Sequence, residues 1–234
     1  MKKAKAFLAG SLILNILFIG IGGYIIHKQG GITFIKEQVA NATSPQKYPD
    51  YYLQNKNIFE SIEVAETDKI FVGDSITDHG EFQEYFPGQA VLNRGISEDT
   101  SDGVLNRIKE VAVRKPKEVY IMIGINDIGA GTDAKTYRKN VDSIIQSFDK
   151  DATKMILQSI LPINNRDFNN DLSNKTVHEF NAILQQLAQK HGVEYIDLHS
   201  AFEDPDGQLK KDITIDGIHL KGEGYKIWMN KLNQ

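Results

Sequence analysis

The sequence predicts a three-layer α/β fold built on a five-stranded parallel sheet, and three observations lead to this prediction. Five short apolar runs alternate with longer segments whose apolar residues recur at helical spacing. The runs are nearly continuous in apolar residues, which is typical of parallel strands covered by helices on both faces. Strand–helix alternation favours parallel pairing through right-handed crossovers. A chain of 234 residues can hold one such domain together with an appendage.

The individual elements follow from these patterns. The predicted strands are 69–73, 90–93, 118–124, 154–160 and 193–198. The predicted helices are 51–62, 100–113, 133–148, 173–190 and 222–232. The helix at 173–190 has a clear end signal, because His191-Gly192 follows it, as is typical of a helix C-terminus. We find no internal repeat and no low-complexity tract.

The amino-terminal segment predicts a membrane anchor. Residues 6–26 carry no charged side chain, and their length is close to the roughly 20 residues that span a bilayer. Three lysines in residues 1–5 predict a cytoplasmic basic tail, and hence a single-pass protein of the cell membrane with its body outside. Residues 27–50 contain glycines and prolines and predict a linker to the domain 51–234.

A cleaved signal peptide is the alternative for this segment. Its apolar region would be shorter, roughly 7–15 residues, and small residues would follow it directly. The stretch Ala40-Asn41-Ala42 has the small-x-small pattern of a cleavage site, but it lies well beyond the apolar run. The length of the run therefore favours the uncleaved anchor.

Charge and cysteine content exclude several classes of protein. Residues 1–50 carry a net charge of +4 and the rest of the chain −8, which gives −4 overall. An acidic body disfavours a nucleic-acid partner, which would require a basic face. The chain has no cysteine, so disulfides, zinc–thiolate sites and cysteine nucleophiles are excluded.

Polar residues follow the strands where chemistry is usually located. Ser75 follows the first predicted strand, Gly95 the second and Asn126 the third. The carboxyl ends of parallel strands meet at one edge of the sheet, so these three residues are expected to lie close together. Asp216 and His219 come late in the chain with a spacing of three. At that spacing a carboxylate can reach the Nδ1–H of the imidazole and fix its tautomer.

These residues together can form a serine nucleophile with its supporting groups. The second imidazole nitrogen of His219 would accept the proton of Ser75. The Asn126 amide, the Gly95 N–H and the Ser75 N–H can form an oxyanion hole, in which each donor contributes about 3–4 kcal/mol. A metal site would need several converging ligands, and the Asp216–His219 pair is better explained by the serine.

The chain contains four sequence blocks in order: Gly73-Asp74-Ser75, Asn93-Arg94-Gly95-Ile96, Gly124-Ile125-Asn126-Asp127 and Asp216-x-x-His219. Together they resemble the four blocks of the SGNH (GDSL-type) hydrolases, over about residues 68–231. The resemblance implies a membrane-anchored bacterial member with a flavodoxin-like fold, strand order 2-1-3-4-5 and esterase or lipase activity without cofactor or metal. It implies that Ser75 is the nucleophile, His219 the base and Asp216 its orienting acid. By the same resemblance Ser75, Gly95 and Asn126 supply the oxyanion donors.

Three positions distinguish this chain from related patterns. Ile76 stands where the family's name-giving motif has Leu. Glu98 stands where a further Gly is common in the second block, and a carboxylate there is expected to narrow the pocket or repel anionic substrates. Thr77 occupies the second Gly position of the Gly-x-Ser-x-Gly elbow, which disfavours the α/β-hydrolase family proper. Asp74 and Asp127 are expected to have structural roles as a helix cap and a turn residue.

The sequence thus predicts a serine esterase that hydrolyses short-chain or acetyl esters at the outer face of the cell membrane. Its expected partners are a small-molecule, glycan or lipid ester and the membrane, with no nucleic acid. Three alternatives remain open: lysophospholipase- or lipase-type hydrolysis of membrane lipids, acyl transfer to another hydroxyl, and a binding module that holds a wall glycan without hydrolysing it.

Overall fold

The computed structural model describes residues 47–233 and, before them, positions 11, 14, 15, 18, 20, 21, 23, 24, 27, 28, 30 and 31. The chain divides into two units, Met1–Pro49 and Asp50–Gln234. Most of the predicted anchor 6–26 and much of the predicted linker 27–50 lie outside the described residues. Across the described positions, no helix has both the length and the apolar character that a membrane span requires.

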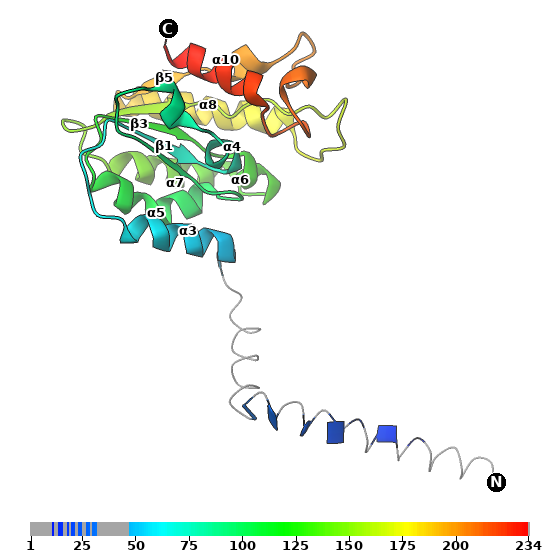
Figure 1. The fold of residues 1–234 in the computed structure, drawn as a ribbon. Coiled ribbons are helices and arrows are strands. Elements are labelled where there is room, and N and C mark those ends of the chain that lie inside the picture. Colours follow the sequence, from blue (N-terminus) through cyan, green and yellow to red (C-terminus); the bar gives the residue numbers. More distant parts are fainter. Residues whose placement is uncertain are drawn as a thin grey trace. The chain divides into compact units, whose positions relative to one another are not determined.

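The second unit alternates strands and helices from its first residue onward (Figure 1). Its strands are β1 (Lys69–Gly73), β2 (Val91–Gly95), β3 (Glu118–Met122), β4 (Lys154–Gln158) and β5 (Glu194–Ile196). Its α-helices are α3 (Asp50–Ser61), α4 (Ser75–Asp78), α5 (Ser101–Ala112), α6 (Ile125–Gly129), α7 (Ala134–Gln146), α8 (Asn174–His191), α9 (His199–Phe202) and α10 (Gly222–Leu232). Two 3₁₀ turns, η1 (Phe82–Tyr85) and η2 (Lys211–Ile213), complete the unit.

The sheet is parallel throughout, in the order β2-β1-β3-β4-β5. This confirms the predicted order. Gly73, at the end of β1, is paired with Gly95 on one side and Met122 on the other, so three strands end level with one another. The residues that follow these strands therefore emerge together at one edge of the sheet.

The three later strands are shorter than the sequence predicts. Their apolar runs continue past the ends of the strands. Residues such as Ile123 and Ile160 lie outside the strands and are nevertheless buried. Burial, rather than strand pairing, keeps these positions apolar. An apolar run therefore marks the buried path of the chain and overestimates the length of the strand.

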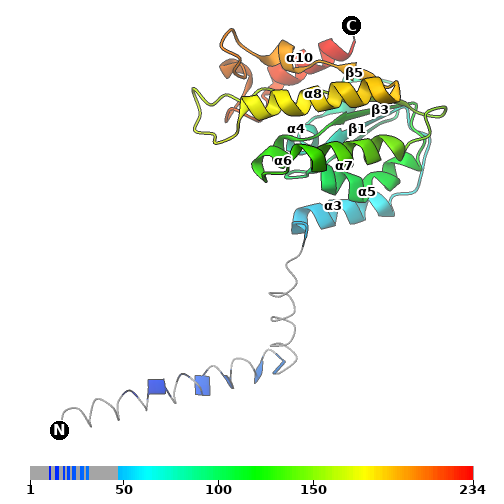
Figure 2. The ribbon, with the colours of Figure 1, turned by 180° about the vertical axis from the view of Figure 1, so that it is seen from behind.

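Two apolar clusters cover the two faces of the sheet. One packs the strands against α5, α7 and α8, which lie side by side in Figure 2, with α3 beyond α5. The other packs the opposite face against η1, α9 and α10, and it contains Trp228, which is fully buried. Tyr52 of α3 is also buried, and its hydroxyl donates to the carbonyl of Gly103 in α5 at 2.8 Å. Helices on both faces give the predicted three layers.

Gly95 allows α4 to approach the end of β2 closely. A Cβ atom at this position would lie 2.1 Å from the backbone nitrogen of Asp78, within α4. The helix that begins with Ser75 can therefore pack on the sheet only if residue 95 has no side chain. The neighbouring Asn93 reinforces this contact, because its Nδ2 donates to the carbonyls of Thr77 at 2.7 Å and Gly80 at 2.8 Å.

We expect Gly95→Ala to destabilise the protein by about 1–3 kcal/mol or more, since the new methyl group meets backbone that must shift. Urea unfolding followed by circular dichroism measures this change. Gly129→Ala is the matched control, because its Cβ would meet only the Leu172 Cδ2 at 3.5 Å, an ordinary contact. Equal unfolding midpoints for Gly95→Ala and the unsubstituted protein would contradict the close approach.

Candidate active site

Ser75 begins α4 directly after β1, at the carboxyl edge of the sheet. Asp74 caps this short helix, and its Oδ1 accepts the N–H of Ile76 at 3.0 Å. The Ser75 side chain is mostly buried, with 8% of the residue exposed, and its Oγ lies 2.8 Å from the Nε2 of His219. The hydroxyl is therefore held at a strand end and in hydrogen-bond contact with an imidazole from the far end of the chain.

Asp216 and His219 form a compact turn before α10. The Oδ2 of Asp216 lies 2.6 Å from the Nδ1 of His219, and its Oδ1 accepts the backbone N–H of His219 at 2.8 Å and of Ile218 at 3.0 Å. Gly217 has a φ of +88°, a left-handed conformation that favours glycine. The Asp216-x-x-His219 spacing thus places the carboxylate on the ring, as the sequence analysis expected.

Hydrogen bonding keeps the Asp216 carboxyl ionised. Partial burial acts to raise its pKa, but the His219 ring and the two backbone N–H groups outweigh burial, so the pKa lies below its ordinary value. An ionised carboxylate on Nδ1 orients the ring and leaves Nε2 facing Ser75. The three side chains therefore form a continuous hydrogen-bonded series across 144 residues of sequence.

Asn126 lies in α6, which follows β3. Its Nδ2 donates to the backbone carbonyl of Asp99 at 2.8 Å. This contact uses one of the two amide hydrogens and orients the side chain, and the second hydrogen has no acceptor among the described residues. The structure therefore places Asn126 beside the loop 96–99, which follows β2.

The N–H of Gly95 has an internal acceptor. It donates to the Oδ1 of Asn93 at 2.7 Å, from the same side chain that binds the α4 carbonyls. In this structure Gly95 is thus a packing position whose N–H is not presented to a ligand. The small size of Gly95 predicts that its N–H is accessible, and the sequence contains no signal for the hydrogen bond to Asn93.

The backbone of Glu98 adopts a conformation that bears on the site and that the sequence patterns do not predict. Its φ of +66° and the hydrogen bond from Asp99 N–H to the Ile96 carbonyl at 3.1 Å resemble a type II turn, whose third residue favours glycine. The N–H of Ser97 donates to Asp78 at 3.1 Å. The N–H of Glu98, however, has no acceptor among the residues that the structure describes. The Gly that is common at this position in the second block was the available signal.

Two buried carboxylates, those of Asp99 and Asp127, help to hold this edge of the sheet in place. Asp99 pairs with Arg107 at 2.8 Å, and the Arg107 Nη2 donates to the carbonyl of Gly73 at 3.1 Å. Burial, opposed by Arg107, raises the pKa of Asp99 to about 6. Asp127 accepts the backbone N–H of Ser101 at 2.8 Å and its hydroxyl at 2.6 Å, in agreement with its expected structural role.

His79 is a further titratable residue near the site. The ring of His79, an exposed residue at the end of α4, is 5.5 Å from that of His219 between centroids.

Within the part of the chain that the structure describes, no three His, Asp or Glu side chains are arranged to hold a metal ion.

Comparison with known proteins gives a family match over most of the second unit. The model of the GDSL-like Lipase/Acylhydrolase family matches residues 71–227. Platelet-activating factor acetylhydrolase IB subunit alpha2 of Rattus norvegicus is 28% identical over 168 residues, which are 68% of this chain and 72% of that protein. Acetylxylan esterase of Geobacillus stearothermophilus is 25% identical over 169 residues, which are 58% of this chain and 77% of that protein.

Solved structures share the fold. A GDSL-like lipase from Bacteroides thetaiotaomicron superposes with a TM-score of 0.68 and is 24% identical, covering 78% of this chain and 95% of that one. The shared fold extends over nearly all of that lipase.

We expect the buried cap Asp74 to make stability fall as the pH rises. Burial, together with the charges of Asp99 and Asp127, raises its pKa from 3.8 to about 7 in the folded protein. The folded state therefore binds a proton between those values that the unfolded state has released, so ionisation favours unfolding. Asp74→Asn keeps an acceptor for the cap and removes this effect. Its stability relative to the unsubstituted protein should increase from about pH 4 to 8, by a few kcal/mol.

Urea unfolding across this pH range measures the difference. Asp133→Asn is the matched control, because Asp133 caps α7 but is exposed, and hydrogen bonds from Thr136 lower its pKa. The effect of that control on stability should be independent of pH above 5, since both states are then ionised. A pH-independent difference for Asp74→Asn would contradict the prediction.

Proposed function

Because the chain belongs to the GDSL-like lipase/acylhydrolase family and is an ester hydrolase, we propose that it acts as a serine esterase with Ser75 as its nucleophile. The observation that carries this proposal is the series from Ser75 Oγ to His219 Nε2, at 2.8 Å, and from His219 Nδ1 to Asp216, at 2.6 Å. A serine hydroxyl becomes a nucleophile when an adjacent base accepts its proton and a third group orients that base.

The reaction proceeds in two halves. Ser75 Oγ attacks the ester carbonyl while its proton moves to His219 Nε2, and Asp216 stabilises the imidazolium. The tetrahedral intermediate collapses, the alcohol leaves with the proton from His219, and an acyl-enzyme remains. Water, deprotonated by His219, then attacks the acyl-enzyme and releases the acid, which restores Ser75.

Three N–H donors are proposed for the oxyanion. The backbone N–H of Ser75 lies at the start of α4, and the Asn126 amide has a hydrogen that Asp99 does not use. We assign the third donor to the N–H of Glu98 rather than to that of Gly95, because the latter donates to Asn93. Such donors act on the charge that develops in the transition state.

Acetyl or other short acyl esters are the proposed substrates. Two relatives are named as an acetylhydrolase and an acetylxylan esterase, and both names denote acetyl esters. In this chain the carboxylate of Glu98 belongs to an exposed residue of the loop 96–99, where it disfavours acyl groups that carry a negative charge. Acyl transfer would use the same residues, and product analysis with a competing alcohol separates it from hydrolysis.

We expect Ser75→Ala to lower kcat on p-nitrophenyl acetate by at least about 10⁴-fold, since the nucleophile is lost while the fold is kept. A fluorophosphonate probe should label the unsubstituted protein at Ser75 and leave the variant unlabelled. Ser147→Ala is the control, because that exposed hydroxyl donates only to the carbonyl of Ser143. Turnover retained in Ser75→Ala would refute the mechanism. A panel of p-nitrophenyl esters of increasing chain length then ranks short-acyl against lipase-type activity.

We also propose that residues 6–26 anchor the enzyme in the cell membrane with its catalytic unit outside. The uncharged run and the three lysines before it support this orientation. The full chain should pellet with membranes, resist high-salt washing and dissolve in detergent, and external protease should remove the activity from intact cells. A chain that begins at residue 47 should remain in the soluble fraction. Release of the enzyme into the medium with a new N-terminus near residue 43 would instead indicate a cleaved signal peptide.

A further inference from the structure

The turn that carries Asp216 and His219 is supported by a separate loop, residues 164–170. The Nδ2 of Asn170 donates to the backbone carbonyl of Asp216 at 3.0 Å. The backbone N–H of Asn164 donates to the next carbonyl, that of Gly217, at 2.9 Å. Two consecutive carbonyls of the turn are thus bound by one loop.

The contact between loop and turn is close as well as polar. A Cβ atom on Gly217 would lie 2.6 Å from the carbonyl oxygen of Asn164 and 2.6 Å from the Nδ2 of Asn170. Glycine at 217 therefore serves the approach of this loop as well as the left-handed φ. The Nδ2 of Asn170 that donates to Asp216 is also one of the two atoms nearest to this position, so Asn170 lies against the centre of the turn.

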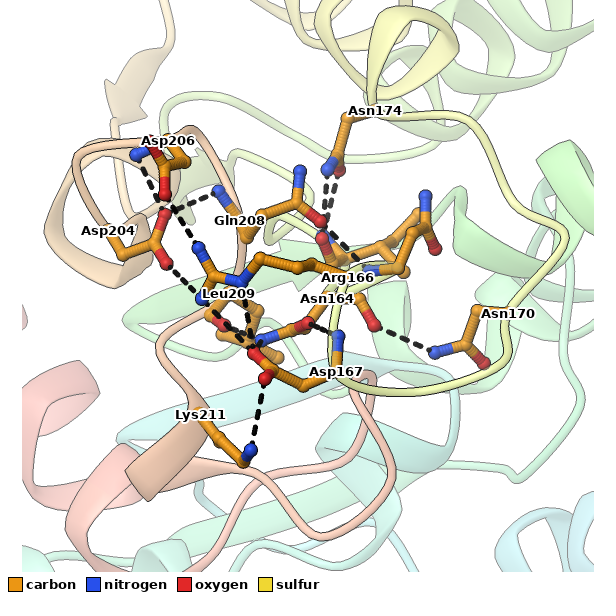
Figure 3. A network of polar contacts seen from close by, with 12 residues as sticks. Asn164, Arg166, Asp167, Asn170, Asn174, Asp204, Asp206, Gln208, Leu209 and Lys211 are labelled. Carbon is orange, nitrogen blue, oxygen red and sulfur yellow. Dashed lines mark hydrogen bonds and ion pairs between the residues drawn. The ribbon is translucent and has the colours of Figure 1, made fainter.

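Asn164 fixes the loop itself, as Figure 3 shows. Its side chain is buried, with Oδ1 accepting the N–H of Asp167 at 2.8 Å and Nδ2 donating to the carbonyl of Leu209 at 2.8 Å. The Nδ2 of Asn170, which donates to Asp216, also donates to the carbonyl of Asn164 at a longer distance of 3.3 Å. Asn170 is therefore oriented between the loop's own backbone and the carbonyl of Asp216.

Charged side chains join this loop to the segment 203–211 (Figure 3). Arg166 contacts Asp167 at 3.1 Å, Asp204 at 2.8 Å and Asp206 at 2.7 Å, and Lys211 contacts Asp167 at 2.9 Å. Hydrogen bonds from Lys211, Asn164 and Arg166 lower the pKa of Asp167 to about 2. Each exposed pair is worth little alone, yet together they restrict the position of the loop.

We propose that Asn170 is a positioning residue of the esterase, holding the Asp216 carbonyl so that the Asp216 carboxylate stays on the His219 ring. The proposal rests on the function proposed for Ser75, His219 and Asp216. The carbonyl and the carboxylate belong to the same residue, so release of the carbonyl lets the backbone of Asp216 rotate and moves its side chain. A displaced carboxylate no longer fixes the tautomer and direction of the imidazole that receives the proton.

Kinetics of the full-length protein test this role. Asn170→Ala should lower kcat on p-nitrophenyl acetate by about 10- to 100-fold and leave KM within about twofold, because the variant loses alignment and not substrate contact. The rate of fluorophosphonate labelling at Ser75 should fall in parallel. Asn170→Asp, which keeps the shape but removes the N–H donor, should lose as much as Asn170→Ala. Asn170→Gln, which keeps the donor, should recover part of the rate.

Asn165→Ala is the matched control, because its Nδ2 donates to the carbonyl of Leu172 at 2.7 Å in the same loop. It should keep kcat. An unchanged kcat in Asn170→Ala would overturn the proposal, as would an equal loss of kcat in Asn165→Ala. These outcomes leave the unsubstituted protein labelled at Ser75, whereas failure of the proposed function would appear as turnover in Ser75→Ala.

Discussion

The close contact between α4 and the glycine at the end of β2 determines how this edge of the sheet is built. A side chain at position 95 would collide with the backbone of Asp78, so the helix that starts at Ser75 depends on that glycine. Asn93 uses both ends of its amide to hold the contact, donating to the α4 carbonyls and accepting the N–H of Gly95. Because this N–H already has an acceptor, the oxyanion donor that we propose lies farther along the loop, at the N–H of Glu98.

The same edge of the sheet contains three buried acidic residues, which have structural roles. Asp74, Asp99 and Asp127 are nearly inaccessible, and burial raises the pKa of each. A protein interior tolerates such groups only when hydrogen bonds or a cation compensate for lost hydration. Here the compensation is local: Asp74 accepts the N–H of Ile76, while Asp99 pairs with Arg107 and presents the carbonyl that orients Asn126. These buried acids help to hold the site rigid, but the raised pKa of Asp74 makes the stability of the protein depend on pH.

The alternation of apolar runs and helical segments predicts the parallel sheet, and the spacing of three predicts the contact between Asp216 and His219. The strand order, and the assignment of this pair to Ser75, are implied by the resemblance to the four hydrolase blocks. It overestimates three strands, since burial keeps residues such as Ile160 apolar after pairing ends. The donor proposed at Glu98 depends on a backbone dihedral angle, for which the only signal in the sequence is the missing glycine. The contacts of Asn170 join a segment without periodicity to a turn 46 residues away, and no local pattern encodes them. The anchor at 6–26 stays a prediction.

The two halves of the site are stabilised by different forces. Ser75 comes directly after the buried strand β1, so the packing of the sheet determines its position. Asp216 is exposed, in a turn that the five strands do not include, so its position depends on hydrogen bonds from the loop 164–170 and on the packing of that loop against Gly217. The ion pairs around Arg166 weaken with salt, whereas the hydrogen bonds of buried Asn164 are screened much less. Neutral amides next to the turn therefore give the Asp216–His219 pair a geometry that is less dependent on ionic strength, which suits an enzyme proposed to work outside the cell.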